Sequence, residues 1–250
     1  MFSLCIPTMD RYDEFLSRYL PVYLSIELVS EIIITDENGN DVEKIRRAFP
    51  NHSKLRLFVN ETRLGPLLNK LHACSYAQNE WIALMDSDNF ANKDYFIAAE
   101  DYIQKNIPSD QKNVILSPCF ARANFNFYNL YGFVYKVGNF EQNKIKEEQD
   151  RHLYSNPGHH TTLMNTGNYV INKYLTDNVS LANEKDIHMS SSCDVIFLNT
   201  LLFEQLDLNL HVVPNMEYDH IVHSGSIYTQ THQYCHNFSV QLHERFARLK

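Results

Sequence analysis

A chain of 250 residues, of which 44% are hydrophobic and 12% aromatic, can bury one large core, and we expect a single domain. The formal net charge of −8 argues against a general nucleic-acid surface, because binding to a phosphate backbone needs clustered Lys and Arg. No apolar run reaches the roughly 18 residues of a membrane span and the first residues carry no basic flank, so we expect a cytoplasmic protein without a transmembrane segment.

Over the first ninety residues, short apolar runs alternate with longer amphipathic segments, a pattern typical of βαβ units in a mostly parallel sheet. Asp41 is predicted to cap the second helix, and Pro66 to stand in the first turn of the third. We predict strands at residues 2–7, 31–35, 55–59 and 81–85, and helices at 11–24, 41–49 and 66–77. Ligands bind at the carboxyl ends of strands in open α/β sheets, which directs attention to Thr8, Asp36, Asn60 and Asp86.

The second half of the chain is less regular. It predicts helices at 94–104 and 193–204, and strands at 114–117, 162–171 and 210–214. Residues 141–160 are polar and close on Asn-Pro-Gly, which indicates a long mobile loop. The adjacent pair His159-His160 in this loop has no cysteine or carboxylate partner at a useful spacing, so we do not interpret it as a zinc site.

Two carboxylates one residue apart follow the fourth predicted strand, in the sequence Asp86-Ser87-Asp88. Held at a rigid strand end, they can bind one hard cation such as Mn²⁺ or Mg²⁺ and leave coordination positions for phosphate oxygens. An acidic turn is the simpler interpretation of an Asp-x-Asp pair by itself. Its position after a fully apolar strand of an alternating sheet favours the metal site.

With these features in place, the sequence resembles the GT-A class of nucleotide-sugar glycosyltransferases, most nearly the family-2-like group. The order and spacing of four segments carry the resemblance, namely residues 4–8, 33–36, 63–70 and 81–88. It implies an α/β fold of GT-A type, with a mostly parallel central sheet flanked by helices. It also implies a Rossmann-like, nucleotide-binding half at residues 1–90, an acceptor-binding half at 91–250, and a role in carbohydrate biosynthesis.

The resemblance implies that the donor lies against Pro7, Thr8, Asp36, Arg63, Lys70, Asp86 and Ser87. The Pro7-Thr8 turn and Asp36 would contact the base and ribose. Asp-Glu-Asn-Gly is also strong turn chemistry, so a turn role for Asp36 stays an equal alternative. A solvated helix face likewise remains an alternative for Lys70.

For the metal, the resemblance implies Asp88 as the main ligand, with Asp86 reaching the ribose or the waters of the ion. A histidine from the C-terminal segment would complete the ligand set. We prefer His223, which precedes Ser-Gly-Ser, and keep His220 as the second choice. The ion, Mn²⁺ or Mg²⁺, would neutralise the leaving diphosphate as a Lewis acid.

Asp194 opens a predicted helix at the position where inverting relatives carry the general base for the acceptor hydroxyl. A helix cap is the local alternative, and the two roles are compatible. Cys193 stands where relatives have a first acid, so retention of configuration stays open. Gly167, in the strand expected to line the acceptor, would let the backbone approach a sugar ring, or would mark a bulge.

The expected partners are a UDP- or GDP-type sugar donor and a carbohydrate or glycoconjugate acceptor. One alternative is a nucleotidyltransferase acting on a sugar phosphate, but residues 8–12 lack the glycine-rich loop of such enzymes. The other alternative is an inactive, carbohydrate-binding homologue. Metal-dependent hydrolysis of the donor separates that alternative from an enzyme.

Overall fold

The computed structural model describes residues 1–122, 125–138, 163–164, 166–184, 194–227 and a few positions beyond 237. The predicted loop at 141–160, with its histidine pair, lies outside these described residues. None of the described helices is both long and apolar enough to cross a bilayer.

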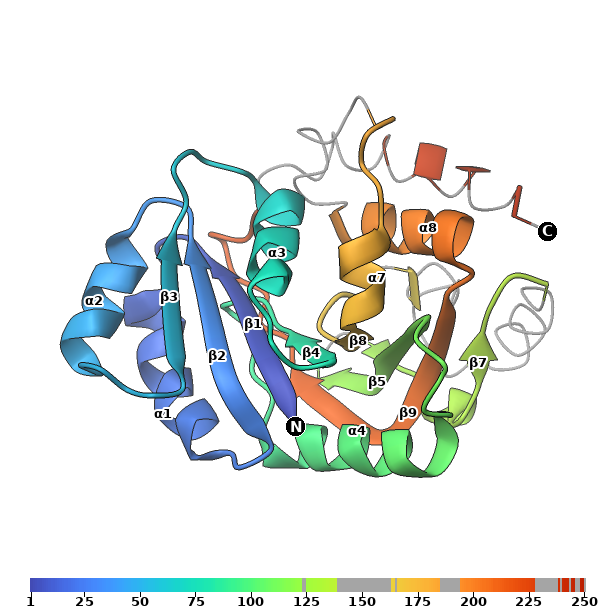
Figure 1. Ribbon diagram of the computed structural model, residues 1–250, viewed down its shortest axis with the longest axis horizontal. Coiled ribbons are helices and arrows are strands. Elements are labelled where there is room, and N and C mark those ends of the chain that lie inside the picture. Colours follow the sequence, from blue (N-terminus) through green and yellow to red (C-terminus); the bar gives the residue numbers. More distant parts are fainter. Residues whose placement is uncertain are drawn as a thin grey trace.

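One nine-stranded mixed sheet runs through the molecule (Figure 1). Its strand order is β3-β2-β1-β4-β8-β5-β9-β7, with β6 paired to β5. The strands β1 to β4 are parallel, β8 is antiparallel to both of its neighbours, and β9 is parallel to β5. Their bounds are β1 Phe2–Thr8, β2 Val29–Asp36, β3 Leu55–Val59, β4 Trp81–Leu84, β5 Val114–Arg122, β6 Phe125–Asn126, β7 Val134–Tyr135, β8 Val170–Asn172 and β9 Asn209–Asp219. The carboxyl ends of β1, β4, β5 and β9 therefore share one edge.

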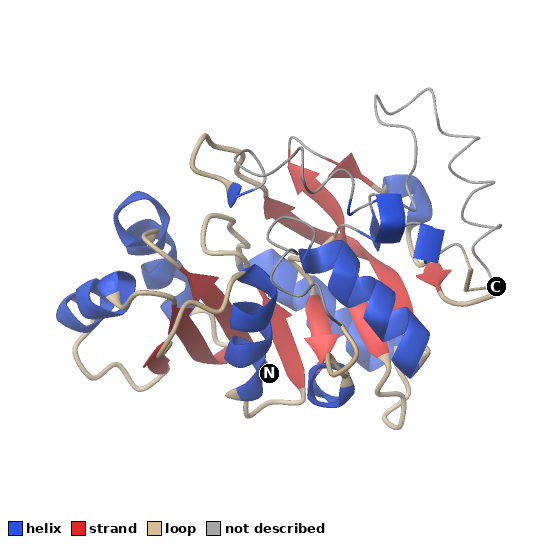
Figure 2. Ribbon diagram, turned by 90° about the horizontal axis from the view of Figure 1, so that it is seen from above, coloured by secondary structure: helices blue, strands red, loops and turns tan. Residues whose placement is uncertain are grey.

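Helices cover both faces of this sheet. Helices α3, α7 and α8 pack on one face, and α1, α2 and α4 on the other (Figure 1). Figure 2, the view from above, shows helices on either side of the strands. Their bounds are η1 Tyr12–Leu16, α1 Ser17–Ser25, α2 Asn40–Ala48, α3 Pro66–Ser75, α4 Lys93–Asn106, η2 Tyr128–Leu130, α7 Lys173–Asn178 and α8 Asp194–Leu206. The prediction of a mostly parallel sheet flanked by helices is confirmed, with β8 as an antiparallel insertion.

The apolar run of β2 shows why the sheet needs both layers. Ile33 belongs to the core on the side of α3 and α8, whereas Ile32 and Ile34 belong to the core on the side of α1 and α4. Successive side chains of a strand point to opposite faces, so an unbroken apolar run can be buried only if both faces are covered.

Several predicted elements differ from the structure. The strand expected at 162–171 is wrong over most of its length, because Leu163 and Met164 are helical and β8 begins at Val170. Strand β5 continues through Pro118, where its register with β9 shifts, and proline is tolerated at such an irregularity. The predicted cap of the second helix is also wrong, because Gly39, with a left-handed φ of 84°, precedes α2 instead.

Candidate active site

The loop that follows β4 is joined to the segment that follows β9 at the carboxyl edge of the sheet. The backbone N–H of Phe90 donates to the carbonyl of Asp219 at 3.0 Å, and the reverse bond is 2.8 Å. The side-chain oxygen of Asn89 accepts the backbone N–H of Ile221 at 2.9 Å. These bonds bring the Asp-Ser-Asp loop and the candidate histidines together, although they lie about 130 residues apart in sequence.

Asp88 and His223 meet across this junction. His223 Nε2 lies 3.0 Å from Asp88 Oδ2, and the two side chains are 14% and 20% exposed. Burial and the nearby carboxylate of Asp86 raise the pKa of Asp88, while His223 acts in the opposite direction. The structure therefore pairs the preferred histidine with the carboxylate predicted as the main metal ligand.

Lys70, on α3, lies between two acidic side chains. Its Nζ is 2.9 Å from Asp86 Oδ1 and 2.6 Å from Asp194 Oδ2, and only 7% of its side chain is exposed. Burial opposes the charge of Lys70, but Asp194 and Asp86 outweigh it and raise the pKa of the ammonium well above its usual value. Lys70 is thus a buried bridge between the two acids, and the alternative of a solvated helix face is wrong.

The pKa values of the two acids that contact Lys70 shift in opposite directions. Burial raises the pKa of Asp194, and the attraction of Lys70 only partly offsets that rise. For Asp86, burial also raises the pKa, but Lys70 and hydrogen bonding outweigh it, so the pKa is lowered. A carboxylate with a raised pKa is the better proton acceptor, which fits Asp194 to general-base chemistry.

Asp36 is fully buried, and its carboxylate accepts hydrogen bonds from neighbouring backbone N–H groups. Its Oδ2 accepts the N–H groups of Asp41 and Val42 at 2.9 and 3.0 Å, and its Oδ1 accepts that of Asn38 at 3.2 Å. These bonds satisfy free N–H groups at the start of α2. The contacts of Asp36 are those of the turn interpretation, and contact with a base stays a prediction.

The other residues predicted to contact the sugar donor lie in different surroundings. Pro7 and Thr8 are the last residues of β1 and do not form a turn, and the hydroxyl of Thr8 donates to Asp41 at 2.5 Å. Ser87 is buried between the two acids of its loop. Arg63 is exposed between β3 and α3, and the structure does not bring it to the acids.

Two residues at this edge were missed by the sequence interpretation. Arg11 donates from its guanidinium to the carbonyl of Gly225 at 2.7 Å, so it holds the segment that carries His223. A basic residue just after the first strand was the available signal. Asn168 contacts Asp86 through its side-chain amide, and its place before β8 gave no local sign of that contact.

The described side chains at this edge provide an incomplete ligand set for the predicted metal. Within the described ranges, no three His, Cys, Asp or Glu side chains gather closely enough to hold a metal ion by themselves. Asp88 and His223 offer one carboxylate and one imidazole, which suit Mn²⁺ when phosphate oxygens complete the set. The residues present fit an ion that binds together with its substrate.

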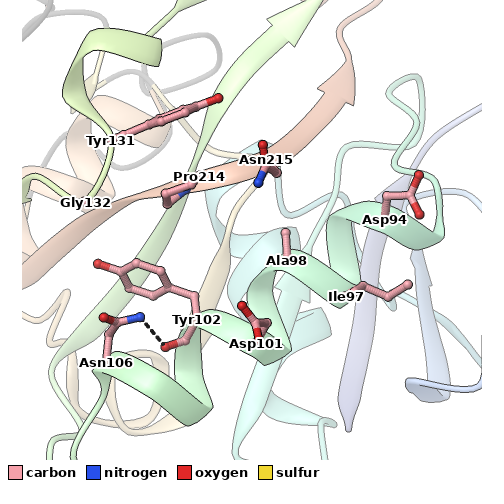
Figure 3. Close-up of a pocket in the computed structure, with 10 residues that line it drawn as sticks. All are labelled: Asp94, Ile97, Ala98, Asp101, Tyr102, Asn106, Tyr131, Gly132, Pro214 and Asn215. Carbon is pink, nitrogen blue, oxygen red and sulfur yellow. Dashed lines mark hydrogen bonds between the residues drawn. The ribbon is translucent and has the colours of Figure 1, made fainter.

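A groove of about 570 Å³ lies elsewhere, between α4 and the middle of β9 (Figure 3). Tyr102 and Tyr131 flank Pro214 there, with Asp94 and Asp101 along the helix. None of the predicted site residues lines this groove, so the candidate chemistry belongs to the sheet edge.

Comparison with known proteins bears on the family and the fold. The sequence profile described as Glycosyl transferase family 2 matches residues 3–164. None of the curated proteins matches the chain.

Solved structures extend the likeness to nearly the whole chain. S. aureus TarS 1-349 has a TM-score of 0.62 at 13% identity, covering 98% of this chain and 70% of TarS 1-349. Its complex with UDP-GlcNAc has a TM-score of 0.61 at 13% identity, covering 91% of this chain and 60% of that one. GalNAc-T7 with UDP, GalNAc and Mn²⁺ has a TM-score of 0.60 at 13% identity, covering 90% of this chain and 44% of that one. At such identity the likeness shows the shared fold.

Proposed function

Because this chain belongs to glycosyl transferase family 2, we propose that it moves a sugar from a nucleoside-diphosphate sugar to an acceptor hydroxyl with the help of Mn²⁺ or Mg²⁺. One observation carries the proposal. The ion pairs of Lys70 with Asp86 and Asp194 stand at the same sheet edge as the Asp88–His223 pair. A single domain, with residues 1–90 binding the donor and residues 91–250 the acceptor, is part of the proposal.

On the donor side, Asp88 and His223 would hold the ion, and Asp86 would face the ribose or the waters of the ion. The ion supplies positive charge that stabilises the leaving diphosphate. Contact of the donor with Pro7, Thr8, Asp36, Arg63 and Ser87 stays a prediction. The structural neighbours crystallised with UDP or UDP-GlcNAc support a UDP-type donor.

On the acceptor side, Asp194 accepts the proton of the attacking hydroxyl. Lys70 holds Oδ2 of Asp194, and the backbone N–H of Val195 also hydrogen-bonds to the carboxylate. Burial favours proton uptake by this carboxylate, because its charged form is poorly solvated. Attack on the anomeric carbon opposite the leaving diphosphate inverts the configuration in one displacement.

The test is nucleotide release from UDP-GlcNAc in the presence of Mn²⁺. We expect UDP and free sugar as slow hydrolysis products, and their loss in Asp194→Asn. Asp101→Asn, on the exposed face of α4, is the matched control and should keep the parent rate. In a parallel assay with UTP and GlcNAc-1-phosphate, release of pyrophosphate would instead indicate nucleotidyl transfer. If neither UDP- nor GDP-sugars give metal-dependent turnover, the chain is an inactive homologue and the proposal is wrong.

A further inference from the structure

The side chain of Asn168 makes two hydrogen bonds with Asp86. Its Oδ1 accepts the backbone N–H of Asp86 at 2.7 Å, and its Nδ2 donates to Asp86 Oδ2 at 3.2 Å. Only 3% of Asn168 is exposed. Since Lys70 occupies Asp86 Oδ1, the two neighbours together fix the rotation of the carboxylate.

Gly167, the residue before it, fixes a different part of the edge. A Cβ on Gly167 would lie 2.4 Å from Cγ2 of Val195, a distance that real side chains do not reach. Val195 follows Asp194 in the first turn of α8. The lack of a side chain at Gly167 therefore sets how closely α8, and with it Asp194, approaches the sheet. The space beside this glycine is filled by Val195 and not by a sugar, which corrects the sequence interpretation.

The segment that carries both residues is held from three directions. The hydroxyl of Tyr95 on α4 donates to the carbonyl of Asn168 at 3.1 Å. The amide of Asn199 on α8 donates to the carbonyl of Thr166 at 3.2 Å. The backbone N–H of Leu84 on β4 donates to the carbonyl of Tyr169 at 2.9 Å. Because the segment is hydrogen-bonded to α4, α8 and β4, it is held in place and can fix the distance between the groups that it contacts.

We propose that Gly167 and Asn168 form a spacer that sets the separation between Asp86 and Asp194, with Asn168 as a positioning residue for Asp86. The inference rests on the proposed function only for the roles of the two acids. One end of the spacer orients the donor-side acid, the other limits the position of the base, and Lys70 spans the resulting gap. Groups that orient functional carboxylates typically change affinity or activity about 10- to 100-fold when removed.

The first test removes the hydrogen bonds between Asn168 and Asp86. Asn168→Ala should weaken binding of UDP with Mn²⁺, measured by calorimetry, about 10-fold. In an Asp86→Ala background the same substitution should have no further effect. The matched control is Asn172→Ala, also a buried asparagine of this segment, whose side chain caps α7 and does not touch Asp86. It should lower stability and leave UDP affinity within about twofold, since it loses a helix cap and a hydrogen bond to Glu80 but no contact with Asp86.

The second test moves the base. Gly167→Ala should push Val195 and lengthen the contact between Lys70 and Asp194 in a crystal structure. Val195→Ala removes the clashing Cγ atoms, so the double variant should restore the parent geometry. A Gly167→Ala structure with Asp194 in its original place would overturn this half of the inference.

Crystal structures of the unliganded variants separate this inference from the proposed function. If the parent does not bind UDP with Mn²⁺ but Asn168→Ala turns the Asp86 carboxylate, the proposed function is wrong and the spacer stands. If the parent binds UDP and Asn168→Ala binds equally well with Asp86 unmoved, the spacer is wrong and the function stands. An equal loss of affinity in the Asp86→Ala background also refutes positioning through Asp86.

Discussion

Removing Lys70 leaves two acidic side chains without their shared cation. In the parent, the side chain of Asp194 is 10% exposed and that of Asp86 32% exposed, and Lys70→Met removes an ion pair shorter than 3 Å from each. Breaking a buried pair by removing one partner costs about 3–5 kcal/mol, because an uncompensated charge stays buried. We expect a loss of that size in the free energy of unfolding at pH 7, measured by urea denaturation. Lys105→Met removes an exposed ion pair on α4 and should cost about 0.5 kcal/mol or less.

The loss in Lys70→Met should depend on pH in a defined direction. Without Lys70, burial and Asp86 both act to raise the pKa of Asp194 further above its value in the unfolded chain. A group with a raised folded-state pKa contributes full stability below its unfolded pKa and loses it as the pH rises through the folded one. The difference between variant and parent should therefore shrink as the pH falls from 7 towards 4. A loss as small as that of Lys105→Met, or one that does not change with pH, would refute the reasoning.

Three further predictions concern the rest of the chain. Burial lowers the pKa of His211 from 6.5 to about 4, so the unfolded chain binds a proton at a higher pH than the folded one. The free energy of unfolding should therefore fall by about 3 kcal/mol as the pH drops from 6.5 to 4. Urea midpoints that are equal for parent and His211→Gln across this range would contradict this prediction. Asn92 caps α4 through the N–H groups of Asp94 and Tyr95, so Asn92→Ala should cost about 1 kcal/mol by urea denaturation, and no loss would show that the cap contributes nothing. Removal of divalent ions with EDTA should lower UDP affinity at least 10-fold by calorimetry, and unchanged affinity would rule out a bridging ion.

The first ninety residues were predictable because each strand there is a short apolar run that ends in polar residues. The bounds of β1, β2 and β4 differ from the predicted ones by at most two residues at either end. Such patterns are local, so neighbouring residues are enough to read them. The strand predicted over the described residues 163–164 and 166–169 was wrong for the opposite reason. Their apolar side chains are buried by α8 and β4, which are distant in sequence, and burial alone does not separate strand from helix or loop.

The candidate site residues show the same contrast between local sequence signals and contacts that are distant in sequence. Asp86, Asp88 and Asp194 were found because carboxylates at a strand end or a helix start are visible in the sequence. The contact of Lys70 with Asp194 spans 124 residues, and that of Asn168 with Asp86 spans 82. The pairing of β8 with β4 creates the contact of Asn168, and the packing of α3 against α8 creates that of Lys70. No periodicity within one element could have shown them.

Anomalous diffraction from crystals soaked with Mn²⁺ and UDP tests the central claim most directly. The account predicts one manganese peak in contact with Asp88 and His223, with the diphosphate of UDP on its open side. Bound UDP with no manganese at this pair, or manganese and UDP both away from the carboxyl edge of β4, would contradict it.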